Sequence, residues 1–455
     1  MTELTCFKAY DIRGRLGVDL DADIATRIAH GFAATLNAHR VVLGRDIRSS
    51  SDELADAVAE ALIADGVEVL DLGLTGTEEM YFAVTHFGAD AGIEVTASHN
   101  PMDYNGMKMV GRGSAPLDAA TFAKVKAASE TAILAPATNP GSRVDISVAA
   151  RAAYVDKVLS FVDVAALPPL RIVVNAGNGA AGPTFDALAK QMAARGATCQ
   201  FIRINHAPDP TFPNGIPNPL LPENQPATAD AVRAHHADLG IAWDGDFDRC
   251  FFFDETGAFI DGEYIVGLLA EAFLMVEPGA RIVHDPRVIW NTRDIVTRHG
   301  GTPIQSRTGH AFVKAALREH DAVYGGEMSA HHYFRDFMFC DSGMIPWLMV
   351  VALMGRTGKP LTELVAERRR MFPSSGEINF TVPNPTAARR RIEEAYAPDA
   401  VARDDTDGLS LDMGTWRFNL RASNTEPVLR LNVEARSDQD LLRRNVERLA
   451  ALIAK

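Results

Sequence analysis

A serine at the tip of a predicted loop is the first residue that could do chemistry. Ser98 follows an apolar run at residues 91–95 that predicts a buried strand, and Asn100-Pro101 then ends regular structure because proline lacks an N–H. Asn105-Gly106 indicates a two-residue hairpin turn, after which the chain returns as a strand carrying Lys108. A serine held in this way suits a nucleophile. A turn serine that only bonds its own backbone would give the same pattern.

Three aspartates follow a second apolar strand, predicted at residues 237–243. Asp244, Asp246 and Asp248 alternate, and three carboxylates together predict an oxygen site for a hard divalent cation, for which Mg²⁺ is the best candidate. The spacing also fits part of an EF-hand calcium loop. Against that reading, Arg249 replaces the glycine that such a loop needs, and residues 251–253 predict a strand rather than a helix. A solvated acidic turn is the other alternative.

A third loop offers a carboxylate, a hydroxyl and an imidazole. Glu327, Ser329 and His331 alternate, so they share one face of an extended chain and could bind the hydroxyl groups of a sugar. Upstream, residues 306–310 precede a predicted helix and could contact an anion through its N-terminus, with His310 as the last of them. As an isolated motif this loop could equally be ordinary surface.

A fourth loop has the composition of a phosphate-binding site. It lies between two strands predicted at residues 416–420 and 429–433. Arginine offers a bidentate fork to phosphate, and small polar residues with exposed N–H groups add neutral donors. The alternative is a hairpin turn with a surface arginine. The residues concerned are Arg421, Ser423, Asn424 and Thr425.

The composition limits the classes of protein and partner. The chain has 455 residues, 47% of them hydrophobic, which predicts three or four domains with sizeable cores. A net charge of −14 argues against nucleic-acid or membrane partners, so an anionic substrate would need a local cationic pocket. Four separated cysteines show no metal or redox spacing, and no apolar signal core opens the chain. We therefore expect a cytoplasmic protein.

Strands and helices alternate along most of the chain and would position these loops. Helices predicted at residues 20–38 and 52–65 flank apolar strands, which favours an α/β architecture. Three strands each end in a polar loop, which suggests three related units that present their loops at the carboxyl ends of strands, where open α/β sheets bind ligands. From about residue 375 the order changes to strand, helix, strands and helix. Taken together, the four loops indicate phosphoryl transfer on a phosphorylated polyol.

These motifs, in this order, resemble those of the α-D-phosphohexomutase family over essentially the whole chain, from residues 7–14 to residues 421–425. The resemblance is greatest to the phosphomannomutase-like branch. It implies three related α/β mixed-sheet domains and a C-terminal α+β domain of the TATA-box-binding-protein-like type around a central cleft. The implied domain boundaries are residues 1–145, 146–255, 256–370 and 371–455.

The resemblance also implies a reaction and roles for individual residues. Ser98 would carry a phosphoryl group and interconvert the 1- and 6-phosphates of mannose, with glucose as a further candidate sugar. The intermediate would be a hexose 1,6-bisphosphate, which would also serve as activator. Mg²⁺ would be bound by the three aspartates and a phosphoserine oxygen. Lys108, Arg13 and His331 would act as acid–base or charge-stabilising groups. Glu327 and Ser329 would hold sugar hydroxyls, and residues 421 and 423–425 the non-reacting phosphate. Further substrate-binding positions are Tyr10, His99, Arg249, Arg287 and His310.

The sequence departs from the family pattern at two positions. Phe247 stands where many relatives have glycine, which could change the loop shape but leaves the three aspartates intact. Arg287 stands where some relatives have lysine, which keeps the charge but could change the hydrogen-bond geometry. A Mg²⁺-dependent sugar-phosphate phosphatase, a catalytically silent sugar-phosphate-binding protein and a phosphoglucosamine mutase are the alternative functions. We expect a monomer or weak homodimer.

Overall fold

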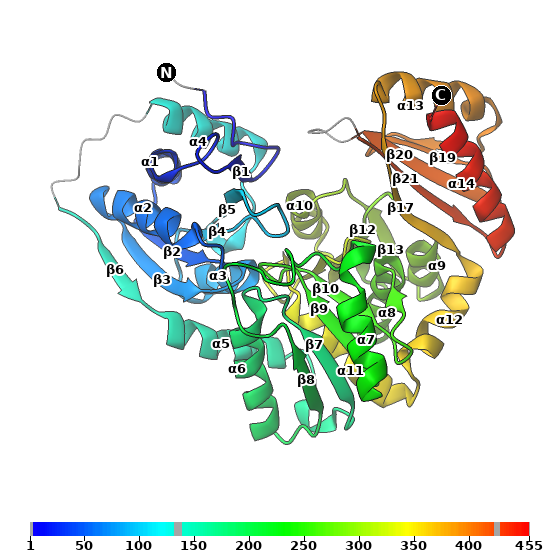
Figure 1. Ribbon diagram of the computed structural model, residues 1–455, viewed down its shortest axis with the longest axis horizontal. Coiled ribbons are helices and arrows are strands. Elements are labelled where there is room, and N and C mark those ends of the chain that lie inside the picture. Colours follow the sequence, from blue (N-terminus) through cyan, green and yellow to red (C-terminus); the bar gives the residue numbers. More distant parts are fainter. Residues whose placement is uncertain (1–2, 132–138, 423–427, 455) are drawn as a thin grey trace. The chain divides into compact units, whose positions relative to one another are not determined.

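The computed structural model describes residues 3–131, 139–422 and 428–454. The chain forms two compact units (Figure 1). Unit 1 consists of residues 1–259 and 334–358, and unit 2 of residues 260–333 and 359–455. Each unit contains α/β structure of its own, so the predicted α/β class is confirmed.

The first sheet of unit 1 positions the serine loop. Its strand order is β1-β5-β4-β2-β3-β6. Strand β2 runs parallel to β3 and β4, whereas β5 runs antiparallel to β4 and β1. Helices α1 and α2 confirm the two helices predicted near the N-terminus. The elements are β1 (Ile12–Arg15), α1 (Ala22–Leu36), β2 (Arg40–Arg45), α2 (Ser51–Ala64), β3 (Glu68–Leu74), α3 (Thr77–His86), β4 (Ala91–Val95), β5 (Tyr104–Gly111), α4 (Ala119–Thr131) and β6 (Ser142–Asp145).

The predicted turn at Asn105-Gly106 is wrong, because both residues lie inside β5. Gly106 pairs with Arg13 of β1, and a Cβ atom at residue 106 would lie 2.1 Å from the carbonyl oxygen of Ile12. The glycine is therefore needed for the close approach of β1 rather than for a turn. The connection from β4 to β5 is the longer segment 96–103, which contains Ser98.

The second sheet of unit 1 positions the aspartate loop. Strands β10, β9, β7 and β8 lie side by side in this order; β7 is parallel to β8 and β9, and β10 is antiparallel to β9. Helix α11 returns to this unit and brings Trp347 to within 5.9 Å of the Phe185 ring. The elements are α5 (Ser147–Leu159), β7 (Arg171–Asn175), α6 (Ala181–Ala194), β8 (Gln200–Ile204), α7 (Pro226–His235), β9 (Leu239–Trp243), β10 (Cys250–Phe253), β11 (Phe259–Ile260), β16 (Cys340–Asp341) and α11 (Met344–Thr357).

Unit 2 begins with a parallel arrangement and ends with an antiparallel sheet. Strand β12 runs parallel to β13 and β14. The last sheet has the order β17-β21-β20-β19-β18, and α13 and α14 pack on it and on each other (Figure 1). The elements are α8 (Gly262–Val276), β12 (Arg281–His284), α9 (Trp290–Arg298), β13 (Thr302–Gln305), α10 (His310–His320), β14 (Tyr324–Gly326), β15 (His332–Phe334), α12 (Leu361–Met371), β17 (Ser374–Thr381), α13 (Pro385–Tyr396), β18 (Ala402–Asp404), β19 (Leu409–Asp412), β20 (Trp416–Ala422), β21 (Val428–Ala435) and α14 (Gln439–Ile453).

The alternating apolar residues of β20 and β21 form the core of the last sheet, as their period of two predicts. Phe418 and Leu420 on β20 and Leu431 and Val433 on β21 are fully buried. Arg421, one of the predicted phosphate-binding residues, lies on β20.

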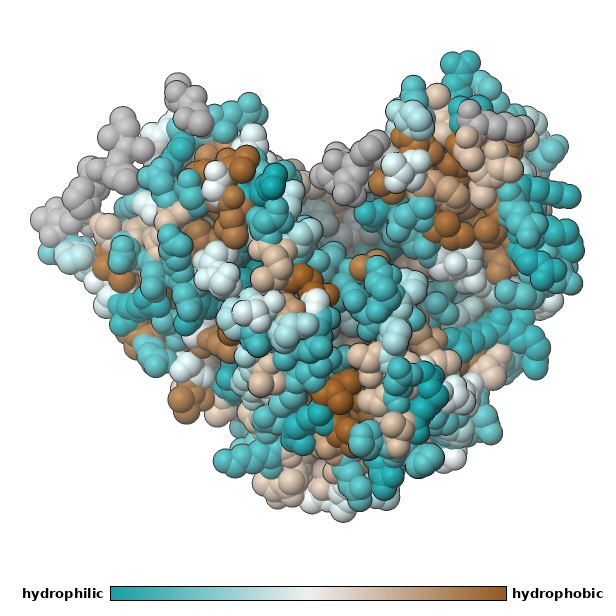
Figure 2. All heavy atoms as spheres, viewed as in Figure 1, coloured by the Kyte–Doolittle hydropathy of each residue, from teal (hydrophilic) through white to brown (hydrophobic). Residues whose placement is uncertain are grey.

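The surface is predominantly hydrophilic on the face seen in Figure 2, with apolar residues in small groups. Within the described ranges, no helix combines the length and the hydropathy that crossing a bilayer requires.

Candidate active site

Ser98 lies at the carboxyl end of β4 in a left-handed backbone conformation, with φ of 49°. Its side chain is almost fully buried, and its Oγ donates to Asp244 Oδ2 at 2.7 Å and lies 3.1 Å from His99 Nδ1. A non-glycine residue with positive φ is uncommon and marks functional sites. The two predicted loops, far apart in sequence, are therefore brought together inside unit 1.

The three aspartates form a buried cluster at the end of β9. Asp244, Asp246 and Asp248 are fully buried, and ligand atoms from the three lie within 4.8 Å of one another. Asp246 Oδ1 accepts no hydrogen bond from any residue that the structure describes. A buried carboxylate oxygen is costly to leave without a partner, so this donor set fits a hard divalent cation. Residues 250–253 form β10, so the EF-hand alternative fails.

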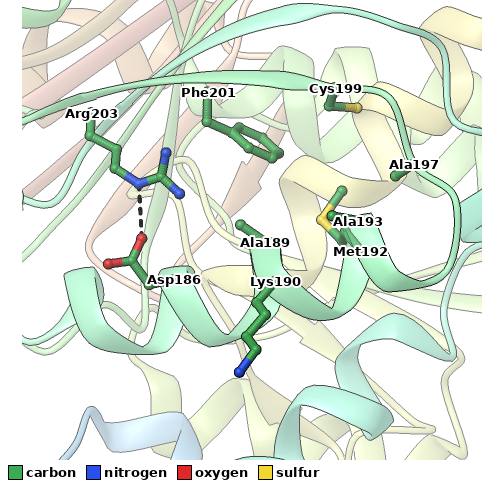
Figure 3. A pocket seen from close by; sticks show the side chains of 9 residues that line it. All are labelled: Asp186, Ala189, Lys190, Met192, Ala193, Ala197, Cys199, Phe201 and Arg203. Carbon is green, nitrogen blue, oxygen red and sulfur yellow. Dashed lines mark hydrogen bonds and ion pairs between the residues drawn. The ribbon is translucent and has the colours of Figure 1, made fainter.

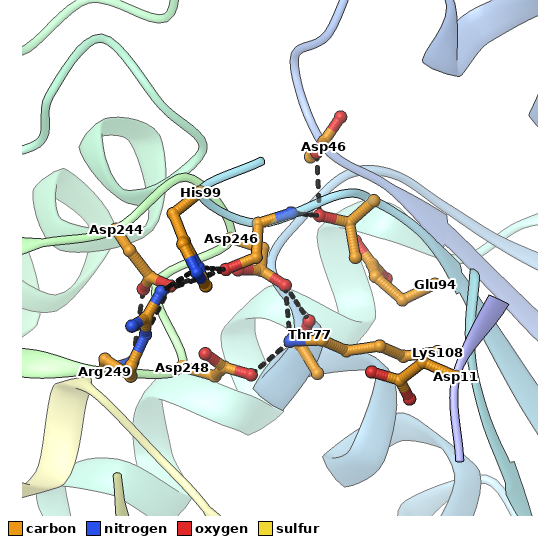
Figure 4. A network of polar contacts seen from close by, with 12 residues as sticks. Asp11, Asp46, Thr77, Glu94, His99, Lys108, Asp244, Asp246, Asp248 and Arg249 are labelled. Carbon is orange, nitrogen blue, oxygen red and sulfur yellow. Dashed lines mark hydrogen bonds and ion pairs between the residues drawn. The ribbon is translucent and has the colours of Figure 1, made fainter. Parts of the chain in front are cut away.

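Lys108 reaches this cluster from β5. Its Nζ donates to Asp246 Oδ2 at 2.7 Å and also to Asp248 Oδ2 (Figure 4). Burial lowers the pKa of Lys108, but the two carboxylates outweigh it and hold the pKa above its ordinary value. Burial likewise raises the pKa of Asp246, and Lys108 reverses that shift, so the pKa of this carboxyl is lowered. The pair therefore stays ionised.

Arg249 and His99 complete the surroundings of the serine hydroxyl. The Arg249 guanidinium donates to Asp244 Oδ2 at 2.8 Å, to Ser98 Oγ at 3.3 Å and to His99 Nδ1. Burial and the charge of Arg249 lower the pKa of His99 well below its usual range. His99 is thus a neutral imidazole that accepts from Arg249.

Arg13 supports the serine loop from β1. Its Nη1 donates to the Thr96 carbonyl oxygen at 2.5 Å, and its Nη2 lies 3.6 Å from Asp11 Oδ2. Tyr10 lies just before β1 and is partly buried.

Gly245 and Phe247 together explain the shape of the aspartate loop, residues 244–248. A Cβ at Gly245 would lie 2.6 Å from the Ser98 carbonyl oxygen, so only glycine allows this approach. Phe247 has φ of 44° and is fully buried, with its ring against Gly76, where a Cβ would lie 2.2 Å away. Phe247 therefore fills space at the start of α3 and leaves the three aspartates in place.

Unit 2 gathers most of the predicted sugar-binding residues. Glu327 accepts from the Gly309 N–H at 2.9 Å and from the Tyr333 hydroxyl at 2.5 Å. The His310 and His331 rings lie 6.4 Å apart. Burial lowers the pKa of Arg287, but Asp285 and other carboxylates hold it above its ordinary value.

Arg287 links this loop to the C-terminal sheet. Its Nη2 donates to Asp285 Oδ2 at 2.7 Å and to Ser329 Oγ at 3.2 Å, and its Nη1 lies 3.6 Å from Glu377 Oε2. Arg421 Nη2 donates to the same oxygen of Glu377 at 2.7 Å. The other predicted phosphate-binding residues, Ser423, Asn424 and Thr425, lie outside the described residues.

Several residues of the site were missed by sequence reasoning. Thr77 donates to Asp246 Oδ2 at 2.6 Å, and Glu377 bridges two arginines. Glu94 is fully buried and pairs with Lys108 across β4 and β5; burial and Asp46 raise its pKa well above the usual range. These partners are distant along the chain and meet only in the folded protein, so no local sequence signal could have found them.

A separate groove lies between α6 and β8 (Figure 3). An ion pair of Arg203 with Asp186, 2.8 Å between Nε and Oδ1, borders it together with Cys199 and apolar side chains. It contains none of the predicted site residues, so the buried cluster around Ser98 remains the candidate active site of unit 1.

Comparison with known proteins agrees with this geometry along the whole chain. Four models of phosphoglucomutase/phosphomannomutase domains match: alpha/beta/alpha domain I at residues 5–134, domain II at 152–257, domain III at 261–372, and the C-terminal domain at 377–452.

Individual relatives match over their full length. The chain is 56% identical to a phosphomannomutase of Salmonella typhimurium (strain LT2) and 54% identical to one of Escherichia coli (strain K12), each over 100% of both chains. A crystal structure of a phosphoglucomutase/phosphomannomutase family protein from Burkholderia thailandensis is 32% identical, with a TM-score of 0.87 over 100% of this chain and 98% of that one. The chain therefore belongs to the α-D-phosphohexomutase, or phosphoglucomutase/phosphomannomutase, family.

Proposed function

We propose that this protein is a phosphomannomutase that interconverts mannose 1-phosphate and mannose 6-phosphate, with Ser98 as the phosphoryl carrier. The observation that carries the proposal is the position of Ser98 Oγ, 2.7 Å from Asp244 in a buried cluster of three carboxylates and two cations. A nucleophile beside a metal-binding carboxylate set is the arrangement that phosphoryl transfer needs. The names of the full-length relatives support mannose as the sugar.

The transfer proceeds in two steps. The phosphoryl group of phosphoserine 98 passes to the 6-hydroxyl of mannose 1-phosphate, which loses its proton and becomes the 1,6-bisphosphate, while Ser98 regains a hydroxyl. After the sugar turns round, Ser98 Oγ loses its proton and attacks the phosphorus that is bonded to the oxygen on carbon 1. The bond between that oxygen and phosphorus breaks, the oxygen takes up a proton, and mannose 6-phosphate leaves. Lys108 stays cationic and, with Arg13, offsets charge on the transferred group. His331 is the proposed base for the sugar hydroxyl.

Asp244, Asp246 and Asp248 would hold Mg²⁺ together with an oxygen of phosphoserine 98, and this ion would offset negative charge on the transferred group when bound. The unpaired Asp246 Oδ1 supports that assignment. Hexose 1,6-bisphosphate is the proposed activator, because it would phosphorylate an enzyme that has lost its phosphate.

Substrate recognition is proposed for the polar residues of both units. Glu327 and Ser329 bind the 3- and 4-hydroxyls, and Arg421 binds the non-reacting phosphate with residues 423–425. The remaining proposed substrate contacts are Tyr10, His99, Arg249, Arg287 and His310. Mannose and glucose differ only at carbon 2, so these contacts leave room for activity on both.

The remaining sequence predictions also stand as proposals. The domain boundaries at residues 145, 255 and 370 are supported by the ranges of the four matching domain models. The four cysteines, at positions 6, 199, 250 and 340, form no disulfide within the part of the chain that the structure describes, which supports a cytoplasmic location. The net charge of −14 supports the absence of a nucleic-acid partner. We propose a monomer or weak homodimer.

Phosphorus NMR tests the function directly. The protein is supplied with Mg²⁺, a trace of hexose 1,6-bisphosphate, and either mannose 1-phosphate or glucose 1-phosphate. Isomerisation of mannose 1-phosphate is expected, and Ser98→Ala should abolish it while hexose-phosphate binding remains measurable. If only inorganic phosphate accumulates, the protein is a phosphatase. Full turnover by the Ser98→Ala variant would refute the phosphoserine role.

A further inference from the structure

A buried arginine lies beneath the serine loop and binds its backbone. Arg48 is 4% exposed, and its guanidinium donates to four carbonyl oxygens, three in the segment that joins β4 to β5 and one at the first residue of β5. Its Nη2 donates to Ser98 O at 2.9 Å and to Asn100 O at 2.6 Å, and its Nη1 donates to Pro101 O at 2.9 Å and to Tyr104 O at 3.2 Å. One side chain thus fixes both ends of the loop.

A second chain of hydrogen bonds reaches the backbone N–H of Ser98. Asp46 Oδ2 accepts from the Thr96 hydroxyl at 2.7 Å, and the oxygen of that hydroxyl accepts from the Ser98 N–H at 2.9 Å. Asp46 Oδ1 accepts from the backbone N–H of Arg48 at 2.9 Å and from the Ser51 hydroxyl at 2.5 Å. The backbone N–H of Ser98 is therefore hydrogen-bonded to Thr96, and its carbonyl oxygen to Arg48.

The hydrogen bonds from Arg48 and Thr96 satisfy buried polar groups of the serine loop. Four carbonyl oxygens converge in a buried place, where each needs a hydrogen-bond donor, and one guanidinium supplies all four charge-assisted bonds. Ser98 itself has φ of 49°, a conformation that a non-glycine residue keeps only when its surroundings impose it. Gly245 also packs closely against the Ser98 carbonyl, and Ser98 Oγ donates to Asp244.

We propose that Arg48, together with Asp46 and Thr96, forms a positioning set that holds Ser98 in the orientation required for phosphoryl transfer. The inference rests on the proposed role of Ser98 as phosphoryl carrier. None of the three residues needs to touch the substrate. Arginine is required because its planar fork presents five donors, whereas lysine has three donors on a single nitrogen and cannot span four carbonyls.

The test compares Arg48→Lys with Arg45→Lys. Arg45 ends β2 three residues earlier and forms an ion pair with the exposed Asp52, so it is a matched control. Each variant is loaded with excess glucose 1,6-bisphosphate in the presence of Mg²⁺, and intact mass gives the phosphorylated fraction. Turnover of mannose 1-phosphate is then measured per phosphorylated molecule, together with KM.

The expected result for Arg48→Lys is a fall of about 10- to 100-fold in kcat per phosphorylated molecule, because displacement of a reacting group by about 1 Å costs rate rather than affinity. KM should stay within about twofold, and the phosphorus NMR signal of phosphoserine 98 should shift. Arg45→Lys should match the wild-type protein. Thr96→Val, which removes the link between Asp46 and the Ser98 N–H without changing charge, should lower kcat in the same way.

Two results would overturn the inference. One is wild-type kcat per phosphorylated molecule in both Arg48→Lys and Thr96→Val. The other is a loss confined to the fraction of folded, phosphorylatable protein, which would show that Arg48 only stabilises the fold. If the wild-type protein accepts no phosphate at Ser98, the proposed function fails instead, and intact mass distinguishes this case. Should Arg48→Lys not fold, Thr96→Val alone decides.

Discussion

Replacing Lys108 with methionine should show how much its positive charge stabilises the cluster of three aspartates. The Lys108 ammonium is 4% exposed and bonds both Asp246 and Asp248, with 2.7 Å between Nζ and Asp246 Oδ2. Methionine has a comparable length and keeps the apolar contacts of the side chain while removing the charge. The variant therefore leaves two buried carboxylates without their shared cation.

The structure sets the size of the effect. Removing one partner of a buried ion pair costs about 3–5 kcal/mol, because the remaining charge stays buried and uncompensated. A divalent cation bound by the same carboxylates offsets part of this loss, by about 2.7 kcal/mol when its concentration is 100 times its dissociation constant. Mg²⁺ should therefore stabilise Lys108→Met more than it stabilises the wild-type protein. The kcat should fall by about 10²- to 10³-fold, the usual range for loss of a group that offsets charge in the transition state.

The assay is thermal unfolding of the wild-type protein and the variant, each with excess EDTA and with saturating Mg²⁺. Lys124→Met, which removes an exposed lysine from α4, is the matched control and should unfold like the wild-type protein in both conditions. A double variant, Lys108→Met with Asp246→Asn, should be less destabilised than the sum of the two single variants, because the residues are in contact.

An equal unfolding temperature for Lys108→Met and wild type in EDTA would refute the reasoning. It would mean that the carboxylates are satisfied without the lysine. A Mg²⁺ effect of the same size in both proteins would show that the ion and Lys108 do not share these carboxylates.

Three further outcomes follow from the structure. Glu377→Gln should raise the affinity for inorganic phosphate severalfold in equilibrium titration, because the Glu377 carboxylate occupies both Arg287 and Arg421. Burial raises the pKa of Glu377, but the two arginines lower it overall, so this residue is charged. Weaker phosphate binding by the variant would contradict this. Burial and Asp261 raise the pKa of Glu263 from 4.5 to about 8. Between these two pH values, Glu263 is protonated in the folded state and ionised in the unfolded state. Stability should fall on the order of a few kcal/mol as pH rises through this window, and Glu263→Gln should remove that slope in pH-dependent unfolding. Excess EDTA should stop turnover while leaving phosphate binding by unit 2 measurable by titration; unchanged turnover would exclude an essential metal ion.

Much of the fold could be predicted from the sequence, because the spacing of apolar residues and the residues that end helices and strands are local features. The helices near residues 20–38 and 52–65, the strands before Ser98 and Asp244, and the alternating strands around Arg421 were all confirmed. Each has a strong pattern of apolar residues and a clear end. The loop residues Ser98 and Asp244 could be identified because they follow buried strands directly.

The errors and omissions concern residues whose roles depend on partners far along the chain. Asn105-Gly106 has the sequence of a hairpin turn, yet β1 packs so closely against Gly106 that the glycine is needed inside a strand. Arg48 follows β2 in an ordinary turn sequence, and nothing local indicates that it bonds carbonyls about fifty residues away. Such contacts arise from sheet order, which local patterns do not specify.

The charges around Ser98 indicate how the serine, Lys108 and a bound metal ion would act together in the proposed reaction. Three carboxylates and the two cations Lys108 and Arg249 leave the unphosphorylated cluster with a formal charge of about −1. A phosphoserine adds a further charge of about −2, which a buried site cannot hold without compensation. A divalent cation returns the sum to about −1, the value before phosphorylation. Phosphorylation of Ser98 and cation binding should therefore strengthen each other, because each offsets the charge that the other brings.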